Sequence, residues 1–505
     1  MTSTDTKVVE PVVADVEKAV TPPATDVGSL ELQTDKEEEA QPDPLLVTWD
    51  GDNDPENPYN WRMLKKMAIT ILLSFGGLVT LMSGAMLAPA LQDIAHDFET
   101  DEEHAQIFLS IYVLAFAFGP MVLAPCTEVF GRRPVWIICA CYYIIWNTAA
   151  GFSKSSGVLI LCRIMSGLGA SAEFAVTNPV LADIWTSDQR GKSYAISTFL
   201  PLLGPALGPI VGGAVTQTVG WRWIFWILSI FDGALVLAGL FFLPETFRVT
   251  LLDRKAAKLR KETGQAYYTA SSHEALSARL TRSLTRPVRM LCTHPTIQFM
   301  GILLAYNFGL LYIVLSTFAL LWIDRYGQSK LIGGLHYLAL VIGYTLASQV
   351  GGKVMDKTWA YLKKRAGGTK TAPEYRVPLM VPGAILVLVG IFTYGWTAEY
   401  RTHWIGPDIG IAIFGCGIIL NTQAMQAYVT EAYLGHVASA SAASQFLRSV
   451  TGFAFPIFAP ALYNALGYGW GNSVLGFAFL AFAAPAPIVL WKFGARMRAK
   501  STNHD

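Results

Sequence analysis

Four charged residues lie inside long apolar stretches of the sequence, where a charge is costly and must face a cavity or a partner. They are Arg163, Glu173, Asp232 and Arg448. A carboxyl group in such a place can bind and release a proton, because its ionised form is unfavourable away from water without a cation. Glu173 is the leading candidate for the proton carrier, and Asp232 is the second candidate. A structural carboxyl group, hydrogen-bonded for packing, is the alternative for each.

A second unusual pattern lies in Leu203–Gly213, which reads LGPALGPIVGG. Its glycines recur every four residues, so on a helix they form a bare stripe that a neighbouring helix can approach closely. Prolines with the same spacing each remove a backbone donor and bend the helix. The freed carbonyl groups need partners inside the protein, so this helix must pack against others. Tight packing within a bundle would explain the glycines alone. The pattern comprises Gly204, Gly208, Gly212 and Gly213 with Pro201, Pro205 and Pro209.

The composition shows in which solvent these residues must work. Hydrophobic residues make up 52% of the 505 positions and charged residues 15%, against about 25% charged in an ordinary soluble domain. The net charge of +1 offers no field that would attract nucleic acid. The six cysteines are scattered, without a CxxC pair or a histidine at metal-binding spacing. We therefore expect a membrane protein with no metal, no cofactor and no nucleic-acid partner.

Apolar runs of about 20 residues, long enough to cross a bilayer core as a helix, recur twelve times. Six precede a polar central stretch and six follow it, which predicts an all-α membrane protein with two six-helix bundles. The expected spans are residues 66–91, 105–126, 134–152, 158–182, 194–219, 224–243, 296–323, 333–355, 377–396, 405–430, 441–466 and 474–491.

The polar segments set the expected domain boundaries. Residues 1–60 form a predicted disordered tail, although its end, Val47–Trp61, is expected to be ordered against the membrane surface. The first bundle covers residues 61–243, the central loop 244–295, the second bundle 296–493 and a short tail 494–505. Within the central loop, Asp253–Gly264 is predicted to form a charged helix, either solvated or lying on anionic lipid.

Lysine and arginine gather in the connections on one side of the predicted bundles. They include Arg132 and Arg133, the basic residues of the central loop, and Lys363–Arg365, whereas Asp93–Glu103 on the other side is acidic. Because cytoplasmic loops carry the excess of positive charge, the central loop and both termini are predicted to be cytoplasmic.

The two predicted bundles echo each other in sequence. Pro205 and Pro209 correspond to Pro456 and Pro460 at an offset of 251 residues, and Asp183 corresponds to Glu431 at an offset of 248. A protein built from such repeats binds its ligand between them. Leu203–Gly213 is therefore predicted to lie in the seam between the two bundles.

Several motifs resemble the major facilitator superfamily, and within it the fungal drug:proton antiporters with twelve spans. The resemblance runs from Val47 to Ser501. Residues 119–134 (GPMVLAPCTEVFGRRP) resemble the loop signature of the superfamily, 161–171 (LCRIMSGLGAS) the signature of its fourth helix, and 203–213 the antiporter signature of its fifth. The stretches 47–61 (VTWDGDNDPENPYNW), 244–247 (PETF), 373–378 (PEYRVP) and 403–410 (HWIGPDIG) resemble the fungal group specifically.

The resemblance implies a proton-coupled antiporter that exports a drug, toxin or secondary metabolite across the plasma membrane. We expect it to be a monomer. Arg163 would support proton transfer, or alternatively hold carbonyl and hydroxyl groups together. A cytoplasmic gating loop would contain Glu128, Gly131, Arg132 and Arg133, in which the arginines pair with Glu128 or a helix end; charges that only set the topology are the alternative.

Polar and aromatic residues at mid-membrane form the expected substrate cavity. They are Tyr306, Asn307, Tyr312, Asn421, Gln423, Gln426 and Arg448. Such a lining suits neutral or amphiphilic aromatic molecules, although hydrogen bonding between helices is the alternative for each residue. The sequence has no P-loop, GxSxG or HExxH motif, so neither an ATP-driven pump nor an enzyme is predicted. Proton-coupled uptake of a nutrient or polyamine and a non-transporting receptor remain as alternatives.

Overall fold

The computed structural model describes residues 45–51, 53–269, 276–365, 372–433, 437–483 and 485–502. Residues 1–44 and 503–505 of the predicted tails lie outside the described residues. From Val47 onward the chain forms one compact unit, and the described part of that unit is helical without any strand.

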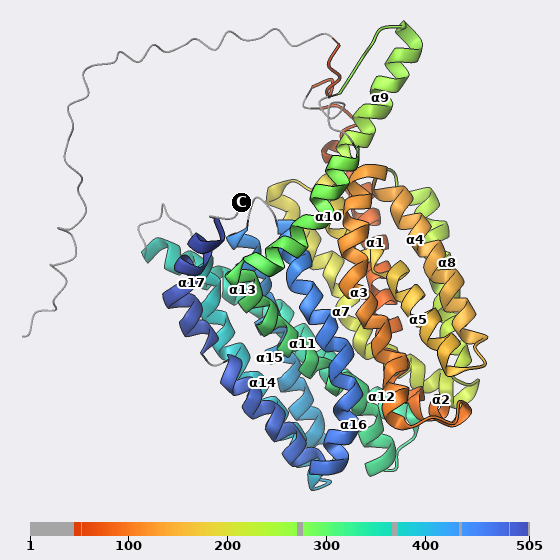
Figure 1. Cartoon of the computed structure of the whole chain (residues 1–505), viewed down its shortest axis with the longest axis vertical. Coiled ribbons are helices and arrows are strands. Elements are labelled where there is room, and N and C mark those ends of the chain that lie inside the picture. Colours follow the sequence, from red (N-terminus) through yellow and green to blue (C-terminus); the bar gives the residue numbers. More distant parts are fainter. Residues whose placement is uncertain are drawn as a thin grey trace, which may run out of the picture. The chain divides into compact units, whose positions relative to one another are not determined.

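We refer to the helices, in chain order, as a first half, a central loop and a second half (Figure 1). The first half contains α1 (Met63–Ala85), η2 (Ala88–Ala90), α2 (Leu91–Asp97), α3 (Glu102–Phe130), α4 (Arg132–Gly151), α5 (Ser156–Ala170), α6 (Ala172–Ile184), α7 (Ser187–Thr218) and α8 (Arg222–Phe242), preceded by η1 (Pro58–Asn60). The central loop contains α9 (Arg248–Thr263) and α10 (Leu276–Thr293). The second half contains α11 (Pro295–Leu320), η3 (Leu321–Arg325), α12 (Lys330–Leu335), α13 (Leu338–Arg365), η4 (Pro373–Leu379), α14 (Met380–Glu399), α15 (Ile405–Ala432), α16 (Val437–Ala483) and α17 (Ala486–Thr502).

Eleven helical segments of the described chain are long and apolar enough to cross a membrane. The last, Ser439–Lys500, has 62 residues and would measure about 90 Å as one helix, three times the bilayer core. Gly467 interrupts it with φ 71° and ψ 176°, and the rings of Tyr463 and Tyr468 stack across this break, so the chain reverses there. The segment therefore makes two passes, which agrees with twelve predicted spans.

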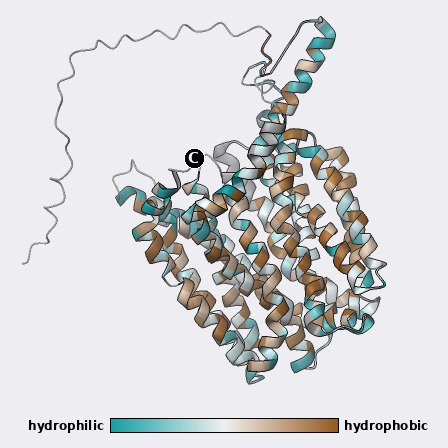
Figure 2. Cartoon of the chain, in the orientation of Figure 1, coloured by the Kyte–Doolittle hydropathy of each residue, from teal (hydrophilic) through white to brown (hydrophobic). Residues whose placement is uncertain are grey.

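The distribution of hydrophobic residues matches a bundle that spans a membrane. Figure 2 shows hydrophobic residues along the length of the bundle helices and hydrophilic residues gathered at their ends and on α9. Many large apolar side chains on the outside, such as Phe241 at 83% exposure, have no protein partner that would bury them, as expected for a surface that faces lipid.

The segment that precedes α1 packs against α9. Val47 lies in a small apolar cluster with Leu252 and Ala256, and its N–H donates to the carbonyl oxygen of Tyr268 over 2.9 Å. Helix α9 begins before the predicted Asp253, at Arg248, and ends at Gly264, whose φ of 71° suits a glycine cap. The expected order in residues 47–61 thus has a protein partner in the central loop.

Candidate functional site

The structure brings Glu173 and Asp232 to one buried cavity inside the first half. Glu173 lies on α6 and Asp232 on α8, and each residue is 7% exposed. The cavity has a volume of about 20 Å³, which admits a single water molecule. Thr80, Trp136 and Tyr143 complete its polar lining. Two carboxyl groups that are 59 positions apart thus face the same small space.

Glu173 is held by neutral donors. The indole N–H of Trp136 donates to Oε2 over 2.7 Å and the hydroxyl of Thr177 donates to Oε1 over 2.8 Å. A Cβ added to Gly76 on α1 would lie 2.9 Å from Oε1, so the glycine leaves room for the carboxyl group. Asp232 has a buried Oδ2 with no hydrogen-bond partner in the described part of the chain. Neither arrangement supplies a cation, so the ionised form of either carboxyl group is costly there.

Arg163 lies outside this cavity and joins three helices of the first half. From α5, its Nε donates to the carbonyl oxygen of Phe108 over 2.9 Å, and Nη2 donates to that of Ser83 over 3.0 Å. The guanidinium group also lies 4.3 Å from the ring centre of Tyr112, a cation–π distance. These contacts match the alternative role, in which the arginine holds carbonyl and hydroxyl groups together.

Two of the expected cavity residues lie where the two halves meet. Tyr312 on α11 is 7% exposed and packs against Phe308, with ring centroids 4.7 Å apart. A Cβ added to Gly84 on α1 would lie 3.6 Å from the Tyr312 hydroxyl, so the contact crosses from one half to the other. Arg448 on α16 lies 4.3 Å from the ring centre of Phe308, and its Nε is buried without a partner in the described residues. The boundary between the two halves, which we call the seam, therefore contains aromatic rings and a hydrogen-bond donor, Arg448 Nε.

The sequence did not single out Tyr112 and Phe308, the two rings that cover the buried arginines. Aromatic residues in apolar helices are common, and no local spacing connects Tyr112 to Arg163 or Phe308 to Arg448. The useful signal is the intramembrane arginine itself, because a guanidinium group in an apolar interior requires carbonyl groups or an aromatic face.

The other expected cavity residues lie within the second half. The Tyr306 hydroxyl donates to the Leu475 carbonyl oxygen over 2.9 Å, and the Asn307 amide donates to the Thr422 hydroxyl over 2.9 Å. Asn421 approaches Gly383 on α14, Gln423 approaches Gly351 on α13, and Gln426 is exposed. Tyr306, Asn307 and Asn421 line one small cavity within the second half, so the structure divides the expected lining between this cavity and the pair at the seam.

The predicted gating loop is organised by a residue outside it. Glu245, which is 3% exposed, accepts hydrogen bonds from the backbone N–H groups of Arg132, Arg133, Thr246 and Phe247 over 3.0, 3.3, 3.0 and 2.9 Å. It thereby caps the N-terminus of α4, which has no side-chain cap of its own. Gly131 has φ 92°, and a Cβ there would lie 2.9 Å from the carboxyl carbon of Glu245. Glycine is required on both counts.

The side chain of Arg132 does not use Glu128 as the sequence suggested. Its Nε lies 3.4 Å from Asp183 Oδ2, and its Nη1 donates to the Thr127 hydroxyl over 2.6 Å. Arg133 donates to the Leu240 carbonyl oxygen over 2.8 Å, in the last turn of α8, so it meets a helix end, which was the other expected partner. Asp183, at the end of α6, is better placed because α6 ends beside the turn, whereas Glu128 belongs to the helix that leads into it.

The second half repeats this pair. Arg376 Nε lies 2.7 Å from Glu431 Oε1, and Glu431 is the counterpart that the sequence offset assigns to Asp183. Each half thus has an arginine–carboxylate pair at the end of the equivalent helix, which supports the repeat that the sequence predicted.

The glycine stripe of α7 packs inside the first half and not in the seam. Cβ atoms added to Gly204 and Gly208 would meet backbone atoms of Met82 on α1 at 3.1 Å each, and one at Gly212 would overlap the Met86 carbonyl group. The seam is formed by the adjacent stripe, where Gly213 contacts Lys330 of α12. Pro209 lies on that stripe too, whereas Pro201 packs against Gly77 of α1, so the seam runs along Pro209 and Gly213 and not along Gly204, Gly208 and Gly212.

Comparisons with known proteins agree with this arrangement. The sequence profile of the Major Facilitator Superfamily matches residues 73–456. "Probable efflux pump mfs2" of Aspergillus flavus is 40% identical over 420 residues, covering 82% of this chain and 99% of that protein. "Efflux pump vrtL" of Penicillium aethiopicum is 40% identical over 466 residues, covering 92% of each.

Solved structures share the fold. The xylose transporter XylE from E. coli, in a partially occluded inward open conformation, superposes with a TM-score of 0.60 at 16% identity. The match covers 85% of this chain and 99% of that one. At this identity the likeness concerns the fold alone, and it confirms the predicted twelve-helix architecture.

Proposed function

The chain belongs to the Major Facilitator Superfamily, and we propose that it exports a small organic molecule from the cell in exchange for protons. The observation that carries the proposal is the shared cavity of Glu173 and Asp232, two buried carboxyl groups that have no cationic partner among the described residues. The names of the two fungal relatives, both efflux pumps, support the direction of transport.

Proton binding at this cavity would favour the dry arrangement of the first half. An ionised carboxylate needs water or a cation, so loss of a proton draws water toward Glu173 and Asp232. A protonated pair removes that requirement and allows the surrounding helices to close. Protons that enter from outside would thus drive the return of the empty transporter. Release of these protons to the cytoplasm would then return the two carboxyl groups to their ionised form.

The seam supplies the groups that would hold the substrate. Phe308, Tyr112 and Tyr312 offer aromatic faces, and the free Nε of Arg448 offers a hydrogen-bond donor. This lining suits aromatic or amphiphilic molecules with a hydrogen-bond acceptor, such as drugs, toxins or secondary metabolites.

We place the protein in the plasma membrane as a monomer, with the termini and the α9–α10 loop in the cytoplasm. The lysine and arginine bias of the connections supports this orientation. The end that carries α2 and α12 is then extracellular, and we refer to it as the extracellular end. In this structure it is closed, because Lys330 pairs with Asp93 and the Gln92 amide donates to Asp324 over 2.9 Å, both across the two halves.

An efflux assay with matched variants tests the proposal. Cells with and without the protein are loaded with a panel of fluorescent aromatic compounds, and retention is followed with the proton gradient intact or collapsed by an ionophore. Glu173→Gln should abolish the dependence of efflux on the gradient, and Asp232→Asn should weaken it. Glu262→Gln, on the exposed face of α9, is the control and should behave as the wild type.

Two results would contradict the proposal. Coupled efflux that is unchanged in both carboxyl variants would remove the cavity as the proton site. Higher retention in the producing cells than in cells without the protein would show uptake in place of export.

A further inference from the structure

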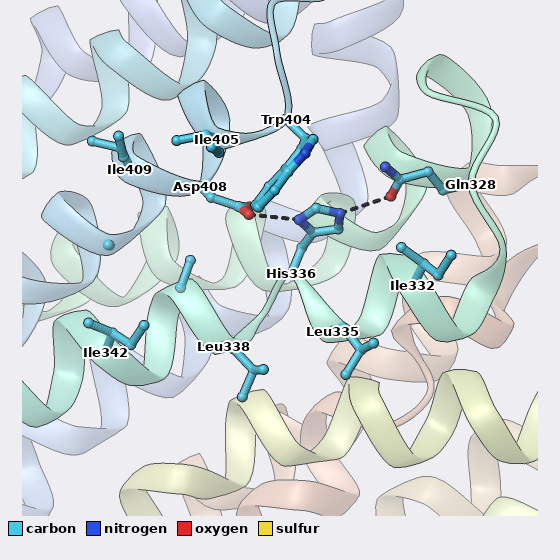
Figure 3. Close-up of a pocket in the computed structure, with 12 residues that line it drawn as sticks. Gln328, Ile332, Leu335, His336, Leu338, Ile342, Trp404, Ile405, Asp408 and Ile409 are labelled. Carbon is cyan, nitrogen blue, oxygen red and sulfur yellow. Dashed lines mark hydrogen bonds and ion pairs between the residues drawn. The ribbon is translucent and has the colours of Figure 1, made fainter.

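A cavity of about 550 Å³ at the extracellular end of the second half has a buried histidine at its base. His336 is 8% exposed and lies between Asp408 and Gln328, as Figure 3 shows. The remaining walls are apolar and come from α12, α13 and the start of α15. Asp408 belongs to the stretch 403–410, which the transport mechanism above leaves without a role.

Both nitrogens of the His336 ring face hydrogen-bond acceptors. Nδ1 lies 2.7 Å from Asp408 Oδ2, and Nε2 lies 2.9 Å from Gln328 Oε1. A neutral imidazole has one N–H and cannot donate to both, whereas the imidazolium ion donates twice. The ring also stacks on Trp322, with centroids 3.6 Å apart and planes inclined by 10°, and an aromatic face favours a cation. This environment is suited to the protonated ring.

Loss of the proton changes these contacts. One ring nitrogen then becomes an acceptor, and the contact with Gln328 survives only if the amide group rotates. The contact with Asp408 loses the strength that a charged hydrogen bond has over a neutral one. The ring is therefore held most firmly when it carries a charge.

His336 lies at the joint between the element that closes the extracellular end and the rest of the second half. It directly follows α12 and precedes α13. Helix α12 touches the first half: the Leu331 N–H donates to Gln217 Oε1 over 3.2 Å, and a Cβ added to Gly334 would lie 2.6 Å from the Pro209 carbonyl oxygen. The bond from His336 to Asp408 anchors this element to α15.

We propose that His336 is a proton-binding regulatory site, whose protonation from the extracellular side anchors α12 to α15 and stabilises the closed extracellular end. The site is separate from the Glu173 and Asp232 cavity. It takes up and returns its proton at the same side of the membrane, so it adds no proton to the transport stoichiometry. The sidedness, though not the switch itself, rests on the proposed function.

Asp408 is the charged group that contacts the His336 ring directly, because the other charged groups nearby are paired elsewhere or exposed. Arg325 of η3 pairs with Glu399 over 3.0 Å, and the Tyr326 hydroxyl donates to the Thr402 carbonyl oxygen over 3.0 Å. Lys330 is engaged with Asp93 and Asp324 with Gln92 across the seam, while Arg401 is exposed in the loop after α14.

The distance between the two halves at this end reports the switch without any substrate. Val219 and Tyr400 are 55% and 74% exposed at the ends of α7 and α14, one in each half. The full chain, with its six native cysteines replaced, carries spin labels on Val219→Cys and Tyr400→Cys and is inserted into nanodiscs. Double electron–electron resonance then gives the distribution of distances between the two labels. The probe is pH alone, from about 5 to 8, and the measurements are made in the Glu173→Gln, Asp232→Asn background, because those carboxyl groups are themselves proposed to couple protonation to this movement.

We expect the ratio of the short to the long distance to fall about tenfold from pH 5 to pH 8, the size of effect of one charged hydrogen bond. His336→Gln should remove this dependence, and Asp408→Asn should reduce it. His403→Gln is the matched control, because that exposed histidine at the same end contacts Trp404 and not α12.

In that background, a pH dependence that persists in His336→Gln, or that is absent while His336 is present, would overturn the proposal. Should His336→Gln fail to fold, Gln328→Leu removes the Nε2 acceptor alone, and a wild-type response in that variant and in Asp408→Asn overturns it equally. The Glu173→Gln, Asp232→Asn background also separates the two proposals. There the distance should still follow pH, even if coupled efflux proves not to depend on Glu173.

Discussion

Gly334 is the position where a single methyl group should hold the extracellular end open. It lies on α12, and its backbone faces Pro209 and Ile210 of α7 in the other half. The atoms it meets are backbone atoms of a packed helix, which cannot rotate away as a flexible side chain would. We therefore expect Gly334→Ala to destabilise the closed extracellular end selectively.

The size of the effect follows from the contact distances. The added Cβ would lie 2.6 Å from the Pro209 carbonyl oxygen, whereas ordinary contact begins near 3.4 Å, so α12 and α7 must separate by about 0.8 Å. Overpacking of this kind costs about 1–3 kcal/mol. At about 1.4 kcal/mol for each factor of ten, the closed population falls about 5- to 150-fold relative to the open one.

Two measurements check this expectation. The label pair at positions 219 and 400 should show a longer distance in Gly334→Ala than in the wild type, and efflux should slow because the extracellular end no longer closes. Gly352→Ala on α13 is the control, since its added Cβ would meet no atom within 4 Å. Wild-type distances and efflux in Gly334→Ala would refute the packing argument.

Three further predictions concern the other contacts. Gly208→Val should lower the melting temperature of the protein, because its side chain overpacks α1 inside the first half at a cost of about 1–3 kcal/mol, and it should leave the distance between the labels unchanged. Glu245→Gln should slow efflux several-fold while the protein still reaches the membrane, because two backbone donors of α4 lose a charged cap; normal rates would remove the gating-loop hypothesis. The Asp50 N–H, reinforced by Lys255, lowers the pKa of Asp54 below 3.8, so this carboxylate stabilises the docked 47–60 segment above that range and loses its effect as the pH falls through the lowered value. Asp54→Asn should therefore release the segment at neutral pH, which the mobility of a spin label at position 48 would show.

Much of the fold followed from local features of the sequence. The length of each apolar run determines whether it crosses a bilayer, since the backbone must satisfy its hydrogen bonds as a helix in lipid. The offset between Asp183 and Glu431 revealed the repeat, and both residues pair with an arginine in the equivalent place. The charged positions inside the spans identified Glu173 and Asp232 because such residues are unfavourable in lipid unless they face a cavity.

Only the tertiary structure decided which of these residues meet. In a soluble helix the apolar stripe marks the buried face, but lipid is as apolar as the protein interior, so a spanning helix carries little sign of its rotation. The sequence could not show that the glycine stripe of α7 faces α1, that Glu245 caps α4, or that His336 lies against Asp408. Each of these contacts joins segments far apart in the chain, and the packing of whole helices sets them, whereas the composition and length of each span are properties of the local sequence.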